Sequence, residues 1–123
     1  MILKDKVIII TGAGPGMGQA MCRGAAAEGA KVVVSARSVE AINTLAAEIN
    51  AAGGDAIAVP CDVAQTEQCH ALAKATIDKW GRIDGMVHSA YYHPDWGSLI
   101  DHSIDQVARA LDVIAVGGLR IEQ

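Results

Sequence analysis

The sequence contains no apolar segment long enough to cross a membrane. Its longest stretch without a charged residue, 7–22, is interrupted by glycines and a proline, and it is shorter than the roughly 18 apolar residues that suggest a membrane-spanning helix. The N-terminus reaches its first charge at Lys4 and has no apolar signal region followed by small residues. We therefore expect a cytoplasmic protein that has no membrane partner.

Paired cysteines and basic clusters are also missing. Cys22, Cys61 and Cys69 show no C-x-x-C spacing, which favours reduced cysteines packed in the core over a disulfide framework or a zinc site. The formal net charge of −4 comes without a basic cluster. This argues against a nucleic-acid surface or an anionic membrane surface as a partner.

The residues that are present alternate between two patterns. The chain has 123 residues and is 51% apolar, which is typical of one folded domain or part of one. Short runs rich in valine and isoleucine predict buried strands, and amphipathic stretches between them predict helices. The strands are expected at 7–10, 31–35, 56–59 and 85–87, and the helices at 17–28, 39–52, 67–80 and from 103 onward. This alternation predicts an α/β fold with a doubly wound parallel sheet.

Glycine and hydroxyl residues mark the expected helix ends. Glycines at 29, 53 and 81 stand where left-handed C-terminal caps are expected. Ser38 and Thr66 stand where N-caps are expected, and Ser103 with Gln106 predicts a capping box.

The segment IIITGAGPGMGQA, residues 8–20, joins the first expected strand to the first expected helix. A helix N-terminus offers unpaired N–H groups and the positive end of the helix dipole, and glycines let an anion approach the backbone. The segment therefore predicts a phosphate-binding loop. Its spacing matches neither the G-x-G-x-x-G fingerprint nor the P-loop motif.

Instead, the loop fits Thr-Gly-x-x-x-Gly-x-Gly, which resembles the short-chain dehydrogenase/reductase family. Three later segments resemble the family at the expected intervals: Asp62-Val63 after the third strand, 84–90 around the fourth, and Asp112-Val113 in the last helix. The resemblance implies a Rossmann-type sheet with strand order 3-2-1-4, truncated after about four strands. Residues 1–123 would be the N-terminal dinucleotide-binding part of a single domain, with the C-terminal catalytic part absent.

The resemblance also implies a set of cofactor-binding residues. The carboxylate of Asp62 would accept a hydrogen bond from the adenine amino group, although a carboxylate at this place also fits a turn or a helix entry. The implied residues are Gly12, Pro15, Gly16, Met17, Gly18, Ser35, Arg37, Ser38, Asp62, Val63, Ser89 and Ala90.

The end of the second strand bears on cofactor choice. In folds of this type a carboxylate about 20 residues past the loop holds the ribose 2′-hydroxyl of NAD, whereas an arginine accommodates the 2′-phosphate of NADP. Ala36 stands at the acidic position and Arg37 follows it. We therefore expect NADP, with NAD as the alternative; the other interpretation of Arg37 is a solvated side chain that leads into a helix.

The sequence also departs from the family pattern. His88-Ser89-Ala90-Tyr91 replaces Asn-Asn-Ala-Gly, and Ile114 occupies the position of the catalytic asparagine. The catalytic serine and the Tyr-x-x-x-Lys motif of the family lie beyond residue 123. We therefore assign no catalytic residue within this chain.

Three of the four aromatic residues lie in 91–97. This segment follows the carboxyl end of a strand, where open α/β sheets bind ligands, so Tyr91, Tyr92, His93 and Trp96 are candidates for the substrate side. The alternative is packing on the surface or on a neighbouring subunit. His88, His93, Asp95 and His102 could be drawn as a metal site, but exposed or satisfied histidines are commoner and we expect no metal.

Two functional hypotheses follow. The first is the cofactor-binding half of an NADP-dependent oxidoreductase that moves hydride between the nicotinamide and a small carbonyl or alcohol substrate. The second is a non-catalytic nucleotide-binding or interaction module. For the 123-residue chain alone we expect no turnover, and we expect poor solubility or assembly into a homo-oligomer, because uncovered apolar sheet edges recruit other chains.

Overall fold

A parallel sheet of four strands forms the centre of the computed structural model, which describes residues 1–90 and 103–122. The strand order is β3-β2-β1-β4, so the implied order is confirmed. Ile9 lies opposite Val33 on one side and Met86 on the other. The strands are β1 (Val7–Thr11), β2 (Lys31–Val34), β3 (Asp55–Ala58) and β4 (Gly85–His88).

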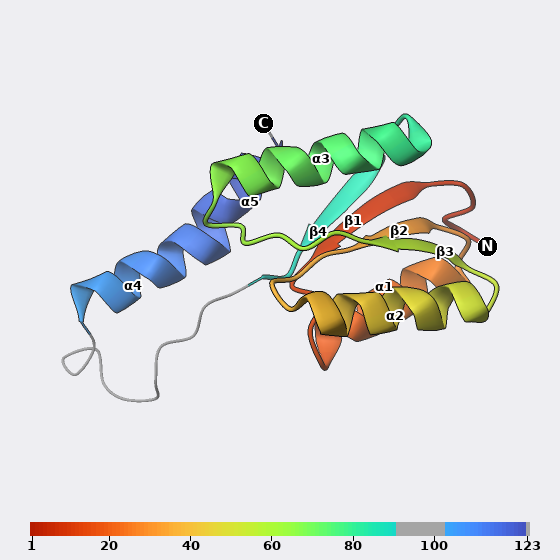
Figure 1. Cartoon of the computed structure of the whole chain (residues 1–123), viewed down its shortest axis with the longest axis horizontal. Coiled ribbons are helices and arrows are strands. Elements are labelled where there is room, and N and C mark those ends of the chain that lie inside the picture. Colours follow the sequence, from red (N-terminus) through yellow and green to blue (C-terminus); the bar gives the residue numbers. More distant parts are fainter. Residues whose placement is uncertain (91–102, 123) are drawn as a thin grey trace.

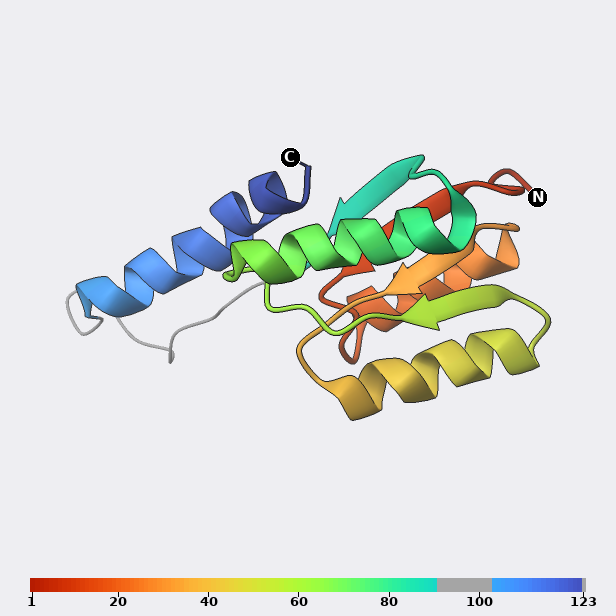
Figure 2. The ribbon, with the colours of Figure 1, turned by 45° about the horizontal axis from the view of Figure 1, so that its top comes forward.

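Helices cover both faces of this sheet. Figure 1 shows α1 (Met17–Ala27) and α2 (Val39–Ala51) on one face, and α3 (Thr66–Trp80) on the other. The last helical segment consists of α4 (Ile104–Leu111), η2 (Asp112–Val116) and α5 (Gly117–Glu122). Its α5 end packs on α3, and α4 reaches beyond the sheet (Figures 1 and 2). The predicted doubly wound fold is thereby confirmed.

Each face of the sheet has its own core because side chains along a strand alternate between faces. On the α1–α2 side, Ile10 packs in a buried cluster with Ile42. On the α3 side, Ile9 packs with Leu72 and Ile121. Helices on both faces account for the continuous apolar strands that the sequence showed.

Most helix ends lie where the sequence predicted them. The glycines at 29, 53 and 81 all have positive φ, at 92°, 92° and 76°, as left-handed C-terminal caps require. Ser38 Oγ accepts the N–H of Ala41 at 3.4 Å, and the capping box at Ser103 is present. The prediction for Thr66 was wrong by one position, because α3 takes Gln65 as its N-cap and has no side-chain cap.

The last helical segment differs from the continuous helix that the sequence predicted. Residues 112–116 form a π-helical stretch between two α-helical pieces. At its end, a Cβ added to Gly117 would lie 2.8 Å from Val63 Cγ2, and one added to Gly118 would lie 3.1 Å from His88 Cδ2. These two glycines let the segment approach the carboxyl ends of the strands closely.

Candidate functional site

The loop between β1 and α1 depends on glycine for its path. Gly12 has φ +64° and Gly16 has φ +95°, values that residues with a Cβ rarely adopt. A Cβ added to Gly12 would lie 2.4 Å from the Ala90 nitrogen, and one added to Gly18 would lie 2.1 Å from the Gly12 oxygen. Because these two glycines lack a Cβ, the loop can pack closely against both the end of β4 and the first turn of α1.

Helix α1 begins at this loop without a side-chain cap. Its N-cap is Gly16, and its first turn holds no acidic residue. The N-terminus of an α-helix carries unpaired N–H groups and a partial positive charge. A Cβ added to Gly14 or Gly16 would meet nothing within 4 Å, so the space beside these two residues can admit an anionic group.

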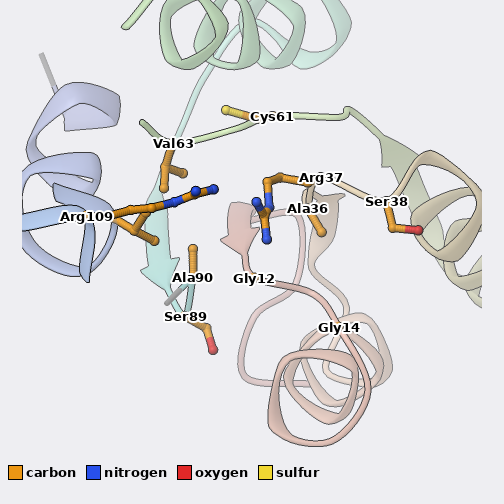
Figure 3. Close-up of a pocket in the computed structure, with 11 residues that line it drawn as sticks. Gly12, Gly14, Ala36, Arg37, Ser38, Cys61, Val63, Ser89, Ala90 and Arg109 are labelled. Atoms are coloured by element: carbon orange, nitrogen blue, oxygen red, sulfur yellow. The ribbon is translucent and has the colours of Figure 1, made fainter. Parts of the chain in front are cut away.

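A pocket of about 530 Å³ opens beside this loop, at the carboxyl ends of the strands. Ligands of open α/β sheets bind at these ends, where the strand order reverses, which here is between β1 and β4. Figure 3 shows the lining residues, which come from the loops after all four strands and from the α4–η2 segment. They are Gly12, Gly14, Ala36, Arg37, Ser38, Cys61, Val63, Ser89, Ala90, Arg109 and Val113.

The structure divides the cofactor-binding residues expected from the sequence into two groups. Those that line the pocket are Gly12, Arg37, Ser38, Val63, Ser89 and Ala90. Those that are not part of its lining are Pro15, Gly16, Met17, Gly18, Ser35 and Asp62. Met17 is 71% exposed and Ser35 is 1% exposed. The Ser35 carbonyl accepts the N–H of Ala13 at 3.0 Å, so the backbone of Ser35 anchors the start of the glycine loop to the end of β2.

Asp62 forms a turn between β3 and α3. Its Oδ1 accepts the N–H of Ala64 at 3.0 Å, and its own N–H donates to Gln68 Oε1 at 2.7 Å. This is the turn geometry that the sequence left open as an alternative. The turn places the neighbours Cys61 and Val63 in the pocket wall.

Sequence reasoning missed several lining residues. Arg109 lies four positions before Val113, so both residues are on the same face of the helical segment, and this spacing from the recognised Asp112-Val113 pair could have identified it. Cys61 was expected only in the core. It is 3% exposed and belongs to the core on the α3 side, and burial raises the pKa of its thiol to about 12.

Two guanidinium groups line the pocket. Arg37 extends from the end of β2 and Arg109 from α4, on opposite walls of the pocket (Figure 3). Clefts lined by charges of one sign attract ligands of the opposite sign. The pocket therefore favours an anion even though the whole chain carries a formal charge of −4.

Hydrogen bonds to side chains attach β4 to β1 at both ends of β4. Asp84 Oδ2 accepts the N–H of Val7 at 2.8 Å. At the other end, Thr11 Oγ1 accepts the N–H groups of Ser89 and Ala90, at 3.1 and 3.4 Å. Thr11 is 1% exposed, so a buried hydroxyl holds two residues that line the pocket.

Ile114, which the sequence resemblance aligned with the family's catalytic asparagine, lies in the π-helical stretch and is 50% exposed. The candidates for the substrate side, Tyr91, Tyr92, His93 and Trp96, lie outside the described residues, as do Asp95 and His102. Within the part of the chain that the structure describes, no helix has both the length and the apolar character to span a membrane.

Comparison with known proteins agrees with this geometry. The family model for short chain dehydrogenases matches residues 6–120. An uncharacterized oxidoreductase of Bacillus subtilis (strain 168) is 40% identical over 110 residues, which cover 89% of this chain and 31% of the relative.

Two solved structures superpose on nearly the whole chain. A short chain dehydrogenase from Mycobacterium smegmatis has a TM-score of 0.90 at 33% identity, covering 98% of this chain and 50% of the neighbour. A 3-ketoacyl-(acyl-carrier-protein) reductase from Brucella melitensis, solved in complex with NADH, has a TM-score of 0.90 at 30% identity, covering 98% of this chain and 48% of the neighbour.

The chain thus spans from about a third to a half of the proteins that it resembles. The shared part contains the glycine loop, the four-stranded sheet and the pocket at its carboxyl edge. The match of the family model over residues 6–120 covers almost all of this part. The chain belongs to the short-chain dehydrogenase family.

Proposed function

We propose that the pocket binds a nicotinamide dinucleotide, and that the complete protein transfers hydride between the nicotinamide and a small carbonyl or alcohol. The observation that carries this proposal is the meeting of the glycine loop, the N-terminus of α1 and the ends of all four strands at one pocket that two arginines line. The complex of the Brucella melitensis reductase with NADH adds support, because that reductase shares this part of the fold.

The described residues fit such a cofactor. The free space beside Gly14 and the N-terminus of α1 suit the pyrophosphate. Val63 and Val113 offer apolar surface for the adenine ring, and Asp62, in the same turn as Val63, would hold the adenine amino group. Ser89 and Ala90 lie at the end of β4, where they would face the nicotinamide half.

We further propose NADP rather than NAD as the cofactor. Arg37 lines the pocket directly after the end of β2, and its neighbour Ala36 supplies no carboxylate for a ribose 2′-hydroxyl. Arg109 on the opposite wall adds a second positive charge. Guanidinium groups pair well with phosphate because their planar donors match its oxygens.

The bound cofactor would supply or accept the hydride, and this chain would bind and orient it. The serine, tyrosine and lysine that the family uses for proton transfer are not assigned to any residue of this chain. The 123-residue chain alone would therefore bind nucleotide without turnover, which is also what the alternative function, a non-catalytic module, would show. The complete enzyme would act in the cytoplasm as a homo-oligomer.

Titration of the 123-residue chain with NADPH and with NADH tests this proposal. Fluorescence would report each Kd, and NADPH should bind more tightly by about tenfold or more, as a charge-assisted pair implies. Arg37→Asp should reverse the order, and Arg109→Ala should weaken NADPH binding. Arg23→Asp is the matched control, because Arg23 pairs with Glu48 on the surface and does not line this pocket. Equal affinities for NADPH and NADH would refute the NADP preference.

A further inference from the structure

The imidazole of His88 bridges two parts of the pocket wall. His88 is the last residue of β4 and is half-buried. Its Nδ1 lies 2.9 Å from Thr11 Oγ1, and its Nε2 lies 2.9 Å from the carbonyl oxygen of Val113. A Cβ added to Gly118 would come within 3.1 Å of the ring, so the missing side chain at Gly118 makes room for the imidazole.

These contacts indicate which ring nitrogen of His88 carries a hydrogen and which one accepts a hydrogen bond. The carbonyl of Val113 can only accept, so Nε2 of His88 carries the hydrogen that is donated to it. In the neutral ring Nδ1 is then an acceptor, and the hydroxyl of Thr11 donates to it. The alternative acceptor for that hydroxyl, the carbonyl of Val87, is farther away at 3.5 Å.

The same hydroxyl completes a chain of bonds across the pocket. With its hydrogen on His88, Thr11 Oγ1 accepts from the backbone N–H groups of Ser89 and Ala90. Ser89 and Ala90 line one wall, and Val113 lines the other. An unbroken path of hydrogen bonds therefore connects the end of β4, through His88, to the π-helical stretch.

We propose that His88 is a positioning residue that sets the separation between these two walls, and thereby the affinity of the pocket for a dinucleotide. The second part rests on the proposed function. π-Helical stretches are uncommon and frequently mark functional sites, and here the Val113 carbonyl within the stretch is held by a side chain from the sheet. The family pattern has asparagine at this position, whose shorter side chain does not reach as far as Nε2 of histidine.

Conservative variants separate the two halves of the bridge. The amide of asparagine has its polar atoms near the position of Nδ1, so His88→Asn keeps a contact with Thr11 and loses the one with Val113. The amide nitrogen of glutamine lies near the position of Nε2, so His88→Gln keeps the contact with Val113. His70→Asn is the control, because His70 is exposed on α3.

The first measurement uses the 123-residue chain without nucleotide. A hydrogen-bonded, half-buried Nε2–H exchanges slowly with water, so we expect a directly detected ring N–H proton for His88 and none for His70 in NMR spectra. His88→Asn should shift the backbone amide resonances of Ser89, Ala90 and Val113. Absence of the ring proton, or unchanged amide resonances, would overturn the proposal.

The second measurement is the Kd for NADPH, at a temperature where every variant is fully folded. His88→Asn should weaken binding by about fivefold, the value of one net hydrogen bond, and His88→Gln should stay within about twofold of the wild type. A residue that only stabilises the fold would change the unfolding midpoint and leave the Kd unchanged, so an unchanged Kd in His88→Asn would also overturn the proposal. If the wild-type chain binds neither NADPH nor NADH, the proposed function fails, and the ring proton and amide resonances alone decide whether His88 joins the walls.

Discussion

The Cα of Gly12 lies so close to the end of β4 that an added Cβ would come within 2.4 Å of the Ala90 nitrogen. The glycine loop therefore does more than admit a ligand, because it also packs against the end of the neighbouring strand β4, where Ser89 and Ala90 line the pocket. The positive φ of Gly12, +64°, adds a second reason for glycine at this position.

Gly12→Ala should destabilise the fold for both reasons. Backbone strain and the collision with the end of β4 together should lower the free energy of unfolding by roughly 2 to 4 kcal/mol, as measured by urea denaturation. Gly24→Ala is the control: it lies inside α1, and an added Cβ there meets nothing within 4 Å. That change should stabilise the helix by about 0.5 to 1 kcal/mol, and equal stability of the two variants would contradict the packing role of Gly12.

The arrangement of the sheet could be predicted because its signals are local. Runs such as Val7–Ile10 are apolar at every position, which fits strands covered on both faces. The positive φ values at Gly29 and Gly81 likewise follow from short-range backbone requirements. The spacing of the glycine loop then identified the family, and with it the strand order.

Features that depend on contacts between distant segments could not be predicted in this way. The π-helical stretch follows the eight residues of α4, which keep an ordinary helical pattern, and Arg120 of α5 links it to the loop after β3. Arg120 Nη1 donates to the Val63 carbonyl at 2.9 Å, and Nη2 pairs with Asp112. No periodicity in the sequence encodes these contacts, or the bridge that His88 makes to Val113.

The cysteines should be unreactive in the folded chain. Burial raises the pKa of Cys22 to about 11 and that of Cys61 to about 12, and it also raises the pKa of Cys69. Only the thiolate attacks disulfide reagents, so at pH 8 the native chain should react with an aromatic disulfide reagent at a small fraction of the rate in urea. Rapid labelling of any one cysteine in the native chain would contradict the burial found here, and mass spectrometry would identify which one.

Stability should decrease in acid partly through Asp84. Hydrogen bonds from Arg82 and from the N–H of Val7 hold the pKa of its carboxyl below the ordinary value. The contribution is therefore present above about pH 4, the ordinary pKa of an aspartate, and is lost as pH falls through the lower pKa of the folded state. Asp84→Asn should lower Tm at pH 7 and flatten its fall between pH 4 and 2. Asp55→Asn, at an exposed position, is the control, and parallel curves for Asp84→Asn and the wild type would contradict the role of Asp84.

The last prediction is that the 123-residue chain binds nucleotide without turning it over. Reduction of a carbonyl needs a proton donor within about 3 Å of the substrate oxygen. The apolar side chain of Ile114 cannot donate or relay a proton, and Tyr91 and Tyr92 are followed four positions later by Asp95 and Trp96 rather than by lysine. We therefore expect the chain to bind nucleotide without supplying this proton.

Turnover is measured by the absorbance of NADPH at 340 nm with a panel of aldehydes and ketones. Ile114→Asn should not restore activity, because an amide alone does not replace the tyrosine and lysine of the family.

Size-exclusion chromatography measures self-association in the same samples. Leu111 is 60% exposed and Leu119 is 59% exposed, so we expect a mass above the 12.7 kDa of one chain. Turnover by a monomer would contradict both expectations. It would mean that a residue assigned here to positioning, with His88 the first to test because its imidazole can carry a proton, supplies the proton itself.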